Sequence, residues 1–170
     1  MSAAYYNEHD PFCCDWLRNL ITAGHIAPGD VDERSILDVQ PEDLRGYTQW
    51  HLFAGIAIWS YSLGQAGWTD DRSVMSLSCP CQPWSAAGQQ KGHADERHLW
   101  PHAFRLIETL RPPVIFGEQV ASKVALSWYD GVKTDLNSIG YSLFGIDIPA
   151  AAFGAPHIRS RLYFVGERND

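Results

Sequence analysis

The chain has 170 residues, of which 45% are hydrophobic and 19% charged, and its 20 acidic and 13 basic side chains leave a formal net charge of −7. This composition excludes a disordered chain, and the length suits a single domain over residues 1–170. The sequence has no apolar run of about 18 residues that would span a membrane, and its first eight residues lack the basic and then apolar pattern of a signal peptide, so we expect a cytoplasmic protein.

The first third of the chain predicts a strand, a helix and a second strand. Residues 3–7 suit a short strand, and Asp10 followed by Pro11 supplies the N-cap and the first-turn proline of a helix. A second strand is expected near residues 34–39, and residues 40–46 form a polar connector. Before Gly24 ends the helix, apolar side chains recur at helical spacing, namely Phe12, Cys13, Trp16, Leu17, Leu20 and Ile21.

The rest of the chain continues this alternation. We expect strands over residues 50–53, 74–77, 114–116, 141–148 and 162–165, with helices over 59–66, from Pro101 onward, and over 125–139. Residues 84–95 are mostly small or polar and include two glycines, which predicts a functional loop. The fold class is therefore α/β, a Rossmann-like doubly wound and mainly parallel sheet that binds its ligands at the carboxyl ends of the strands. The two later helices are expected to bury Ala103, Leu106, Ile107, Leu110, Trp128, Val132 and Leu136.

The four cysteines form an adjacent pair, Cys13 and Cys14, and a pair one residue apart, Cys79 and Cys81. Neither spacing matches a structural zinc site, so we expect no metal, and we interpret Cys13 and Cys14 as packing residues.

The most informative segment is residues 78–85, which read SCPCQPWS directly after a predicted strand. Cys81 stands between two prolines, and such a stiff turn presents the sulfur in one orientation, as a nucleophile requires; a small buried cysteine in a tight loop is the alternative. Glu118 follows the next predicted strand, whose end opens at the same edge of a parallel sheet. The two side chains are therefore predicted to share a pocket in which a thiolate attacks an electron-poor ring and a carboxyl group donates a proton.

Arg159 and Arg161 stand at the start of the last predicted strand. Two residues apart on an extended segment, they would point to one face and bind a carbonyl oxygen or a phosphate. A solvated edge strand explains the same pattern.

These segments, in this order and with Phe53-Ala54-Gly55 after an apolar strand, resemble the DNA cytosine-5 methyltransferase family over about residues 5–165. Enzymes of this family use S-adenosylmethionine, turn a cytosine out of the duplex, attack its carbon 6 with the cysteine of a Pro-Cys pair, and transfer methyl to carbon 5. The resemblance implies that Cys81 is the nucleophile and that Glu118 contacts ring nitrogen 3. It also implies that the two arginines contact the base oxygen and support the site.

The same resemblance assigns further residues to cofactor and substrate. A phosphate-facing loop and the position after the catalytic glutamate give three expected substrate-binding residues, Gln82, Ser85 and Gln119. The cofactor turn and the residue before the nucleophile give four expected cofactor contacts, Phe53, Gly55, Ile56 and Pro80.

Only 28 positions separate Phe53 from Cys81, where the family usually has two more strand units. The front of this chain resembles those two missing strand units. There Glu8, followed by His9, is placed to accept from the ribose hydroxyls of the cofactor. The adenine element is either residues 29–31, with Asp30, or residues 35–38, with Ile36, and the sequence does not decide between them. We therefore expect a circular permutation, in which residues 1–48 are displaced cofactor-binding units and residues 49–170 carry the cofactor turn, the catalytic loop and the base pocket.

Four positions depart from the family pattern. Ala57 and Ile58 replace two glycines and are expected to crowd the cofactor, Gln119 replaces an asparagine, and His157 replaces a glutamine. The resemblance also predicts a minimal catalytic domain without a target-recognition domain. Residues 1–50 hold nine acidic and three basic side chains, a net of −6, so DNA binding should depend on a second polypeptide or on a homo-oligomer that supplies target recognition.

Three other functions remain open. The chain could be a catalytically impaired, methyltransferase-like binding or regulatory protein, or a methyltransferase acting on a cytosine nucleotide or a single strand. A nicotinamide-dependent oxidoreductase is a weaker alternative because the full Gly-x-Gly-x-x-Gly pattern is absent.

Overall fold

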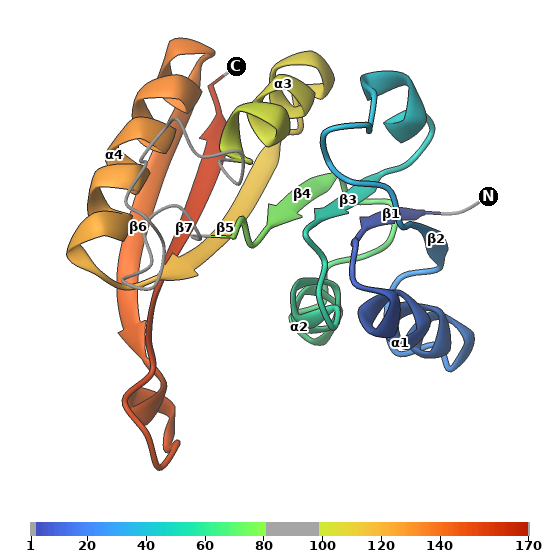
Figure 1. The fold of residues 1–170 in the computed structure, drawn as a ribbon, viewed down its shortest axis with the longest axis horizontal. Helices are drawn as coiled ribbons and strands as arrows, with labels where there is room; N and C mark the ends of the chain where they lie inside the picture. The colour runs from blue at the N-terminus through green and yellow to red at the C-terminus, as the bar shows by residue number, and fades with distance from the viewer. Residues whose placement is uncertain (1–2, 81–98, 170) are drawn as a thin grey trace.

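The computed structural model describes residues 3–80 and 99–169 (Figure 1). The helices of these residues are α1 (Pro11–Thr22), α2 (Ile58–Gln65), α3 (Trp100–Leu110) and α4 (Lys123–Ser138), with short 3₁₀ turns η1 (Pro41–Leu44) and η4 (Ala150–Phe153). Their strands are β1 (Ala4–Asn7), β2 (Gly29–Asp32), β3 (Gln49–Leu52), β4 (Val74–Leu77), β5 (Val114–Val120), β6 (Tyr141–Pro149) and β7 (Ser160–Arg168).

The strands form one sheet in the order β2-β1-β3-β4-β5-β7-β6. The first five of these strands are mutually parallel, whereas β7 runs antiparallel to both β5 and β6. The predicted mainly parallel, doubly wound α/β sheet is therefore confirmed. Strand β3, which leads into the glycine turn, pairs with β1 on one side and β4 on the other, so the front of the chain lies beside the centre of the sheet.

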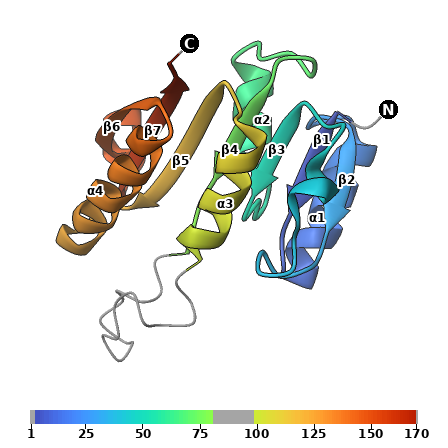
Figure 2. The same ribbon diagram turned by 90° about the horizontal axis from the view of Figure 1, so that it is seen from above.

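Helices cover both faces of the sheet (Figure 2). One core lies under α3, α4 and η1, and a smaller core lies under α1 and the start of α2. Tyr5 belongs to the first core and Tyr6 to the second, as expected for consecutive residues of a strand. The later helices bury the residues predicted for them, except that Leu110 is only partly buried. In the part of the chain that the structure describes, no helix is long and apolar enough to cross a membrane.

The cap of α1 is as predicted, and only some of its apolar side chains are buried. The Asp10 carboxylate accepts a hydrogen bond from the backbone N–H of Cys13 at 3.0 Å, and Pro11 occupies the first turn. Leu17 and Cys14 are fully buried, whereas Phe12 is 71% exposed and stacks on the partly exposed Trp16. The helical spacing thus predicted the helix, but of its apolar side chains the two rings stay exposed while Leu17 is buried and Leu20 and Ile21 pack against the core.

The second strand is also not where it was predicted. Residues 34–39 contain a turn at residues 36–38 instead of a strand, and the strand is β2, which precedes them. Ile36 and Val39 are buried like strand residues, but they reach the core from this non-strand segment. A glycine is needed at the start of β2, because a Cβ at Gly29 would lie 2.2 Å from the Ala4 carbonyl oxygen.

Smaller differences affect the site. The expected connector at residues 40–46 contains η1. Strand β5 extends through Val120, so Glu118 lies within the strand rather than beyond its end. Strand β7 begins at Ser160, so Arg159 precedes it with a φ of +34° and only Arg161 is in extended backbone.

Candidate active site

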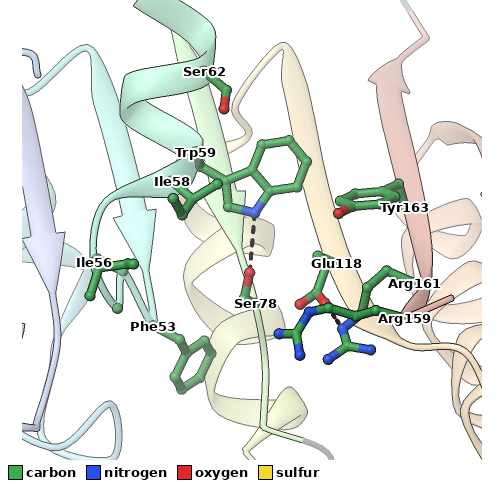
Figure 3. Close-up of a pocket in the computed structure, with 12 residues that line it drawn as sticks. Phe53, Ile56, Ile58, Trp59, Ser62, Ser78, Glu118, Arg159, Arg161 and Tyr163 are labelled. Atoms are coloured by element: carbon green, nitrogen blue, oxygen red, sulfur yellow. Dashed lines mark hydrogen bonds and ion pairs between the residues drawn. The ribbon is translucent and has the colours of Figure 1, made fainter. Parts of the chain in front are cut away.

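Two adjoining cavities open at the carboxyl ends of the parallel strands. They share Phe53, Gly55 and Ser78, which follow β3 and β4. The first cavity, of about 610 Å³, is further lined by Ala54, Ile56, Ile58, Trp59, Ser62, Glu118, Arg159, Arg161 and Tyr163 (Figure 3). The second, of about 490 Å³, is further lined by Asn7, Glu8, His9, Ser35, Ile36, Pro80 and Leu99.

The Glu8 carboxylate joins the front of the chain to the glycine turn. One of its oxygens accepts from the backbone N–H of Gly55 at 2.7 Å. The other accepts from the backbone N–H groups of His9 and Asp10 at 2.8 and 2.9 Å. Ala54 N–H also donates to the Asn7 carbonyl at 3.0 Å. Four hydrogen bonds thus fix the end of β1, and three of them hold the carboxylate at the wall of the second cavity.

The turn after β3 depends on left-handed backbone at three positions. Phe53, Gly55 and Ala57 have φ values of +52°, +54° and +67°. Ala57 is 2% exposed and packs in the core with Leu17, and it lines neither cavity. Ile58 is exposed and lines the first cavity, so of the two residues that replace family glycines only Ile58 faces a cavity.

Of the two segments expected to hold the adenine element, only the one with Ile36 lines the second cavity. Ile36 and Ser35 line the second cavity together with His9 and Pro80. Asp30 does not line it, and its carboxylate accepts from the Tyr47 hydroxyl at 2.9 Å.

The first cavity contains an ion pair between neighbouring strands. Arg161 Nε donates to Glu118 Oε1 at 2.8 Å, and both side chains are largely buried. In the sheet register Glu118 faces Tyr163, so Arg161 reaches it from the next position on the same face. Arg159 joins them from outside the strand, and Figure 3 shows both guanidinium groups and the carboxylate turned toward one space.

Trp59 and Tyr163, which sequence reasoning did not assign to the site, form part of its wall. The Trp59 indole N–H donates to Ser78 Oγ at 3.1 Å (Figure 3). The same ring stacks on Phe116, with centroids 5.6 Å apart, and meets Tyr163 edge-on. A single sequence carries no signal that would assign Trp59 to the site. In the sequence, Trp59 is only an apolar residue at the start of a predicted helix.

Gln119, expected to contact substrate, lies on the opposite face of the sheet from Glu118. Its side chain is 2% exposed and lines neither cavity. Its amide N–H donates to the Cys79 carbonyl at 3.0 Å. Its amide oxygen accepts from the backbone N–H of Val120 at 2.9 Å.

The expected nucleophile Cys81 and the expected substrate contacts Gln82 and Ser85 lie outside the described residues. The front cysteines are poor nucleophiles. Burial raises the pKa of the Cys14 thiol to about 11, and burial together with the nearby Glu8 raises the pKa of Cys13. Both residues are therefore protonated thiols at neutral pH. Cys14 is buried, as its predicted packing role requires, whereas Cys13 is only partly buried.

Solved structures define the class of fold first. The chain superposes on the Entamoeba histolytica methyltransferase EhMeth with a TM-score of 0.61 and 13% identity, covering 98% of this chain and 45% of that one. It superposes on the S. pombe Dnmt2 methyltransferase with a TM-score of 0.56 and 16% identity, covering 100% and 52%. The fold is therefore that of methyltransferases.

The sequence then identifies the family. The model of the C-5 cytosine-specific DNA methylase family matches residues 69–170, more than half of the chain, and the chain belongs to this family. It is 33% identical over 104 residues to the type II methyltransferase M.HhaI of Haemophilus parahaemolyticus, covering 59% of this chain and 32% of the relative. It is likewise 33% identical over 106 residues to M.NlaX of Neisseria lactamica, covering 58% and 33%. The chain thus spans about a third of the length of these curated relatives.

Proposed function

We propose that this chain is the catalytic unit of a DNA cytosine-5 methyltransferase, which transfers a methyl group from S-adenosylmethionine to carbon 5 of cytosine. One observation carries the proposal beyond family membership. The cavity that contains the Glu118–Arg161 pair shares a wall with the cavity that contains the Glu8 carboxylate. A base in the first cavity would therefore lie next to a methyl donor in the second.

The residues of the second cavity fit S-adenosylmethionine. A carboxylate has about four lone-pair positions, and the backbone N–H groups around Glu8 use three of them, so one remains for a ribose hydroxyl. Ile36 and Phe53 offer apolar surface for the adenine ring. When bound, S-adenosylmethionine supplies an electrophilic methyl group. The residues proposed to hold it are Glu8, His9, Ile36, Phe53, Gly55 and Pro80 of this cavity, together with Ile56, which lines the first cavity.

The residues of the first cavity suit work on a pyrimidine ring. We assign Cys81 as the nucleophile whose thiolate forms a bond to carbon 6, while Glu118 contacts ring nitrogen 3 and donates the proton that balances the added electron pair. Arg161 fixes the Glu118 carboxyl group, and Arg159 stands beside it to bind the base oxygen. A partly buried site strengthens these charge-assisted hydrogen bonds relative to water.

The proposal includes a circular permutation of the domain. The first two strands of the chain continue the sheet beyond β3, in the order β2-β1-β3. The Glu8–Gly55 hydrogen bond places the acidic residue after β1 against the turn after β3. The match to the family model begins at residue 69, after both elements. These observations support a chain whose second and third strand units precede the first.

We further propose that target recognition comes from outside these 170 residues, in a second polypeptide or another copy of the chain. The relatives are about twice as long, and the charge of −7 opposes unaided binding to a polyanion. Measuring the mass of the chain in solution, alone and with DNA, separates self-association from dependence on another protein.

The function is tested by covalent trapping. A pool of random-sequence DNA carrying 5-fluorocytosine, as duplex and as single strand, is incubated with the chain and S-adenosylmethionine. Fluorine at carbon 5 prevents the proton loss that would release the cysteine, so a denaturation-resistant adduct should accumulate with the wild type and with Cys79→Ser but not with Cys81→Ser. At DNA concentrations high enough to offset the lack of target recognition, the absence of a wild-type adduct on both DNA forms would contradict the function, and an adduct with Cys81→Ser would remove Cys81 from its role.

A further inference from the structure

The end of β4 leaves the sheet while its neighbour continues. In the parallel pairing of β4 with β5 the last partners are Leu77 and Gly117, yet β5 runs on to Val120. Ser78 and Cys79 therefore follow the last ladder pair. They are the first residues of the path that leads through Pro80 to Cys81.

Beyond the last ladder pair, the Gln119 side chain makes the link between β5 and the chain that leaves β4. Two residues beyond the last pair on each strand, the Gln119 amide donates to the Cys79 carbonyl at 3.0 Å. The same amide is fixed at its other end, because its oxygen accepts from the backbone N–H of Val120 at 2.9 Å. Both ends of this buried amide are thus engaged with backbone, as a buried amide requires.

Strand geometry excludes the role first expected for Gln119. Consecutive residues of a strand point to opposite faces. Glu118 lines the first cavity, so Gln119 points away from it and lies in the interior. A direct contact with a base in that cavity would require the strand to turn over.

We infer that Gln119 is a positioning residue, which sets the direction in which the chain leaves β4 toward the nucleophile. This inference rests on the proposed function, which makes Cys81 that nucleophile. The Cys79 carbonyl is held by Gln119, and the next residue is Pro80, whose ring fixes its φ angle, so little backbone freedom remains before Cys81. Ser78 is held as well, by the indole of Trp59.

The length of the side chain is part of the inference. Asparagine, which the family resemblance places here, is one methylene shorter, or about 1.5 Å in reach. From the same backbone position an asparagine amide would fall short of the Cys79 carbonyl. The extra methylene of Gln119 is therefore used to span the gap that opens where β4 and β5 separate.

The test compares two variants with a matched control. Gln119→Glu keeps the shape but puts an oxygen against the Cys79 carbonyl, and Gln119→Asn keeps the amide but shortens it. Gln65→Glu makes the same chemical change at an exposed position of α2. Each full-length variant is assayed for the rate of adduct formation on 5-fluorocytosine DNA, for the Kd of S-adenosylmethionine by calorimetry, and for its melting temperature.

We expect adduct formation to slow at least 10-fold with Gln119→Glu, and to slow less with Gln119→Asn, while the Kd stays within twofold of the wild type. Assays are run below the melting temperature of each variant. If Gln119→Glu does not fold, the rate measured with Gln119→Asn decides the test. Unchanged adduct rates in a folded variant would overturn the positioning role, and so would a loss of cofactor affinity that parallels the loss of rate. A wild type that forms no adduct would overturn the proposed function and this inference with it.

Discussion

Glu8 and Gly55 are 47 positions apart in the sequence, and the carboxylate of the first accepts the backbone N–H of the second at 2.7 Å. A charge-assisted hydrogen bond of this kind contributes about 1.5–3 kcal/mol. It joins two walls of the second cavity, one from the residue that follows β1 and one from the turn after β3. The acidic front of the chain is thus part of the candidate site.

Replacing Glu118 by glutamine should affect catalysis far more than cofactor binding. The amide oxygen can still accept from Arg161 Nε, so the site keeps its shape, but the group loses its transferable proton. General acid–base catalysis is worth about 10²–10⁴-fold, and we expect kcat to fall by at least 10²-fold while the Kd of S-adenosylmethionine stays within twofold. Glu167→Gln, an exposed change on β7, is the control. Equal losses in kcat and in cofactor affinity would argue that Glu118 only supports the fold.

Changing Ala57 to glycine should leave cofactor affinity unchanged. Its methyl group packs in the core near Leu17 and does not line a cavity, so the crowding expected at this position should not occur. Relief of the left-handed backbone, about 1–2 kcal/mol, is offset by the loss of a buried methyl, about 0.8 kcal/mol, and by the extra freedom of glycine in the unfolded chain, about 0.5–1 kcal/mol. Calorimetry should give a Kd within twofold of the wild type, and urea unfolding should show little change. A Kd at least tenfold tighter would show instead that the methyl obstructs the cofactor.

Acid should destabilise the protein through His51. Burial lowers the pKa of this imidazole to about 3, and its nitrogens lie 2.7 Å from Ser76 Oγ and 3.3 Å from Gln49 Oε1. The unfolded histidine has a pKa near 6.5, so between these two values the unfolded state binds the extra proton and the free energy of unfolding falls as the pH falls. The slope attributable to this residue approaches about 1.4 kcal/mol per pH unit below pH 6.

Urea unfolding of the wild type and of His51→Gln between pH 7.5 and 5 measures that slope. The variant should be less stable at pH 7.5 but should depend less on pH, since the exposed histidines contribute equally to both proteins. Parallel pH profiles for the two proteins would exclude His51 as the group responsible.

Local signals predicted much of the fold. The Asp10 cap and Pro11 mark the first turn of α1, and the buried positions Val132 and Leu136 follow from helical periodicity in α4. Such signals depend on neighbours in the sequence. The exposure of Phe12 depends instead on which side of α1 meets the sheet, and the turn at Ile36 depends on how β2 pairs with β1. Neither relationship is recorded in residue spacing.

The candidate site shows the same division. Glu8 and Gly55 could be grouped because the family resemblance assigns both to the cofactor, and Cys81 could be grouped with Glu118 because the ends of parallel strands share an edge. The sequence could not place side chains whose position depends on the face of the sheet they point to or on the distance they span. Gln119 follows Glu118 in the sequence but points to the other side of the sheet, and Trp59 reaches Ser78 only because α2 packs against the end of β4.

The measurement closest to the central claim is a calorimetric titration of S-adenosylmethionine into the wild type, Glu8→Gln and Glu42→Gln. Glutamine at position 8 places an NH₂ group against a backbone N–H that the carboxylate now accepts, whereas Glu42 is an exposed acid paired with Arg45 away from both cavities. We predict saturable binding by the wild type and Glu42→Gln, and a Kd about 10- to 100-fold weaker for Glu8→Gln, matching the loss of one charge-assisted hydrogen bond. No heat from the wild type at about 1 mM ligand, where only about −4 kcal/mol of affinity is needed, or equal Kd values for all three proteins, would contradict the assignment of the front of the chain to the cofactor site.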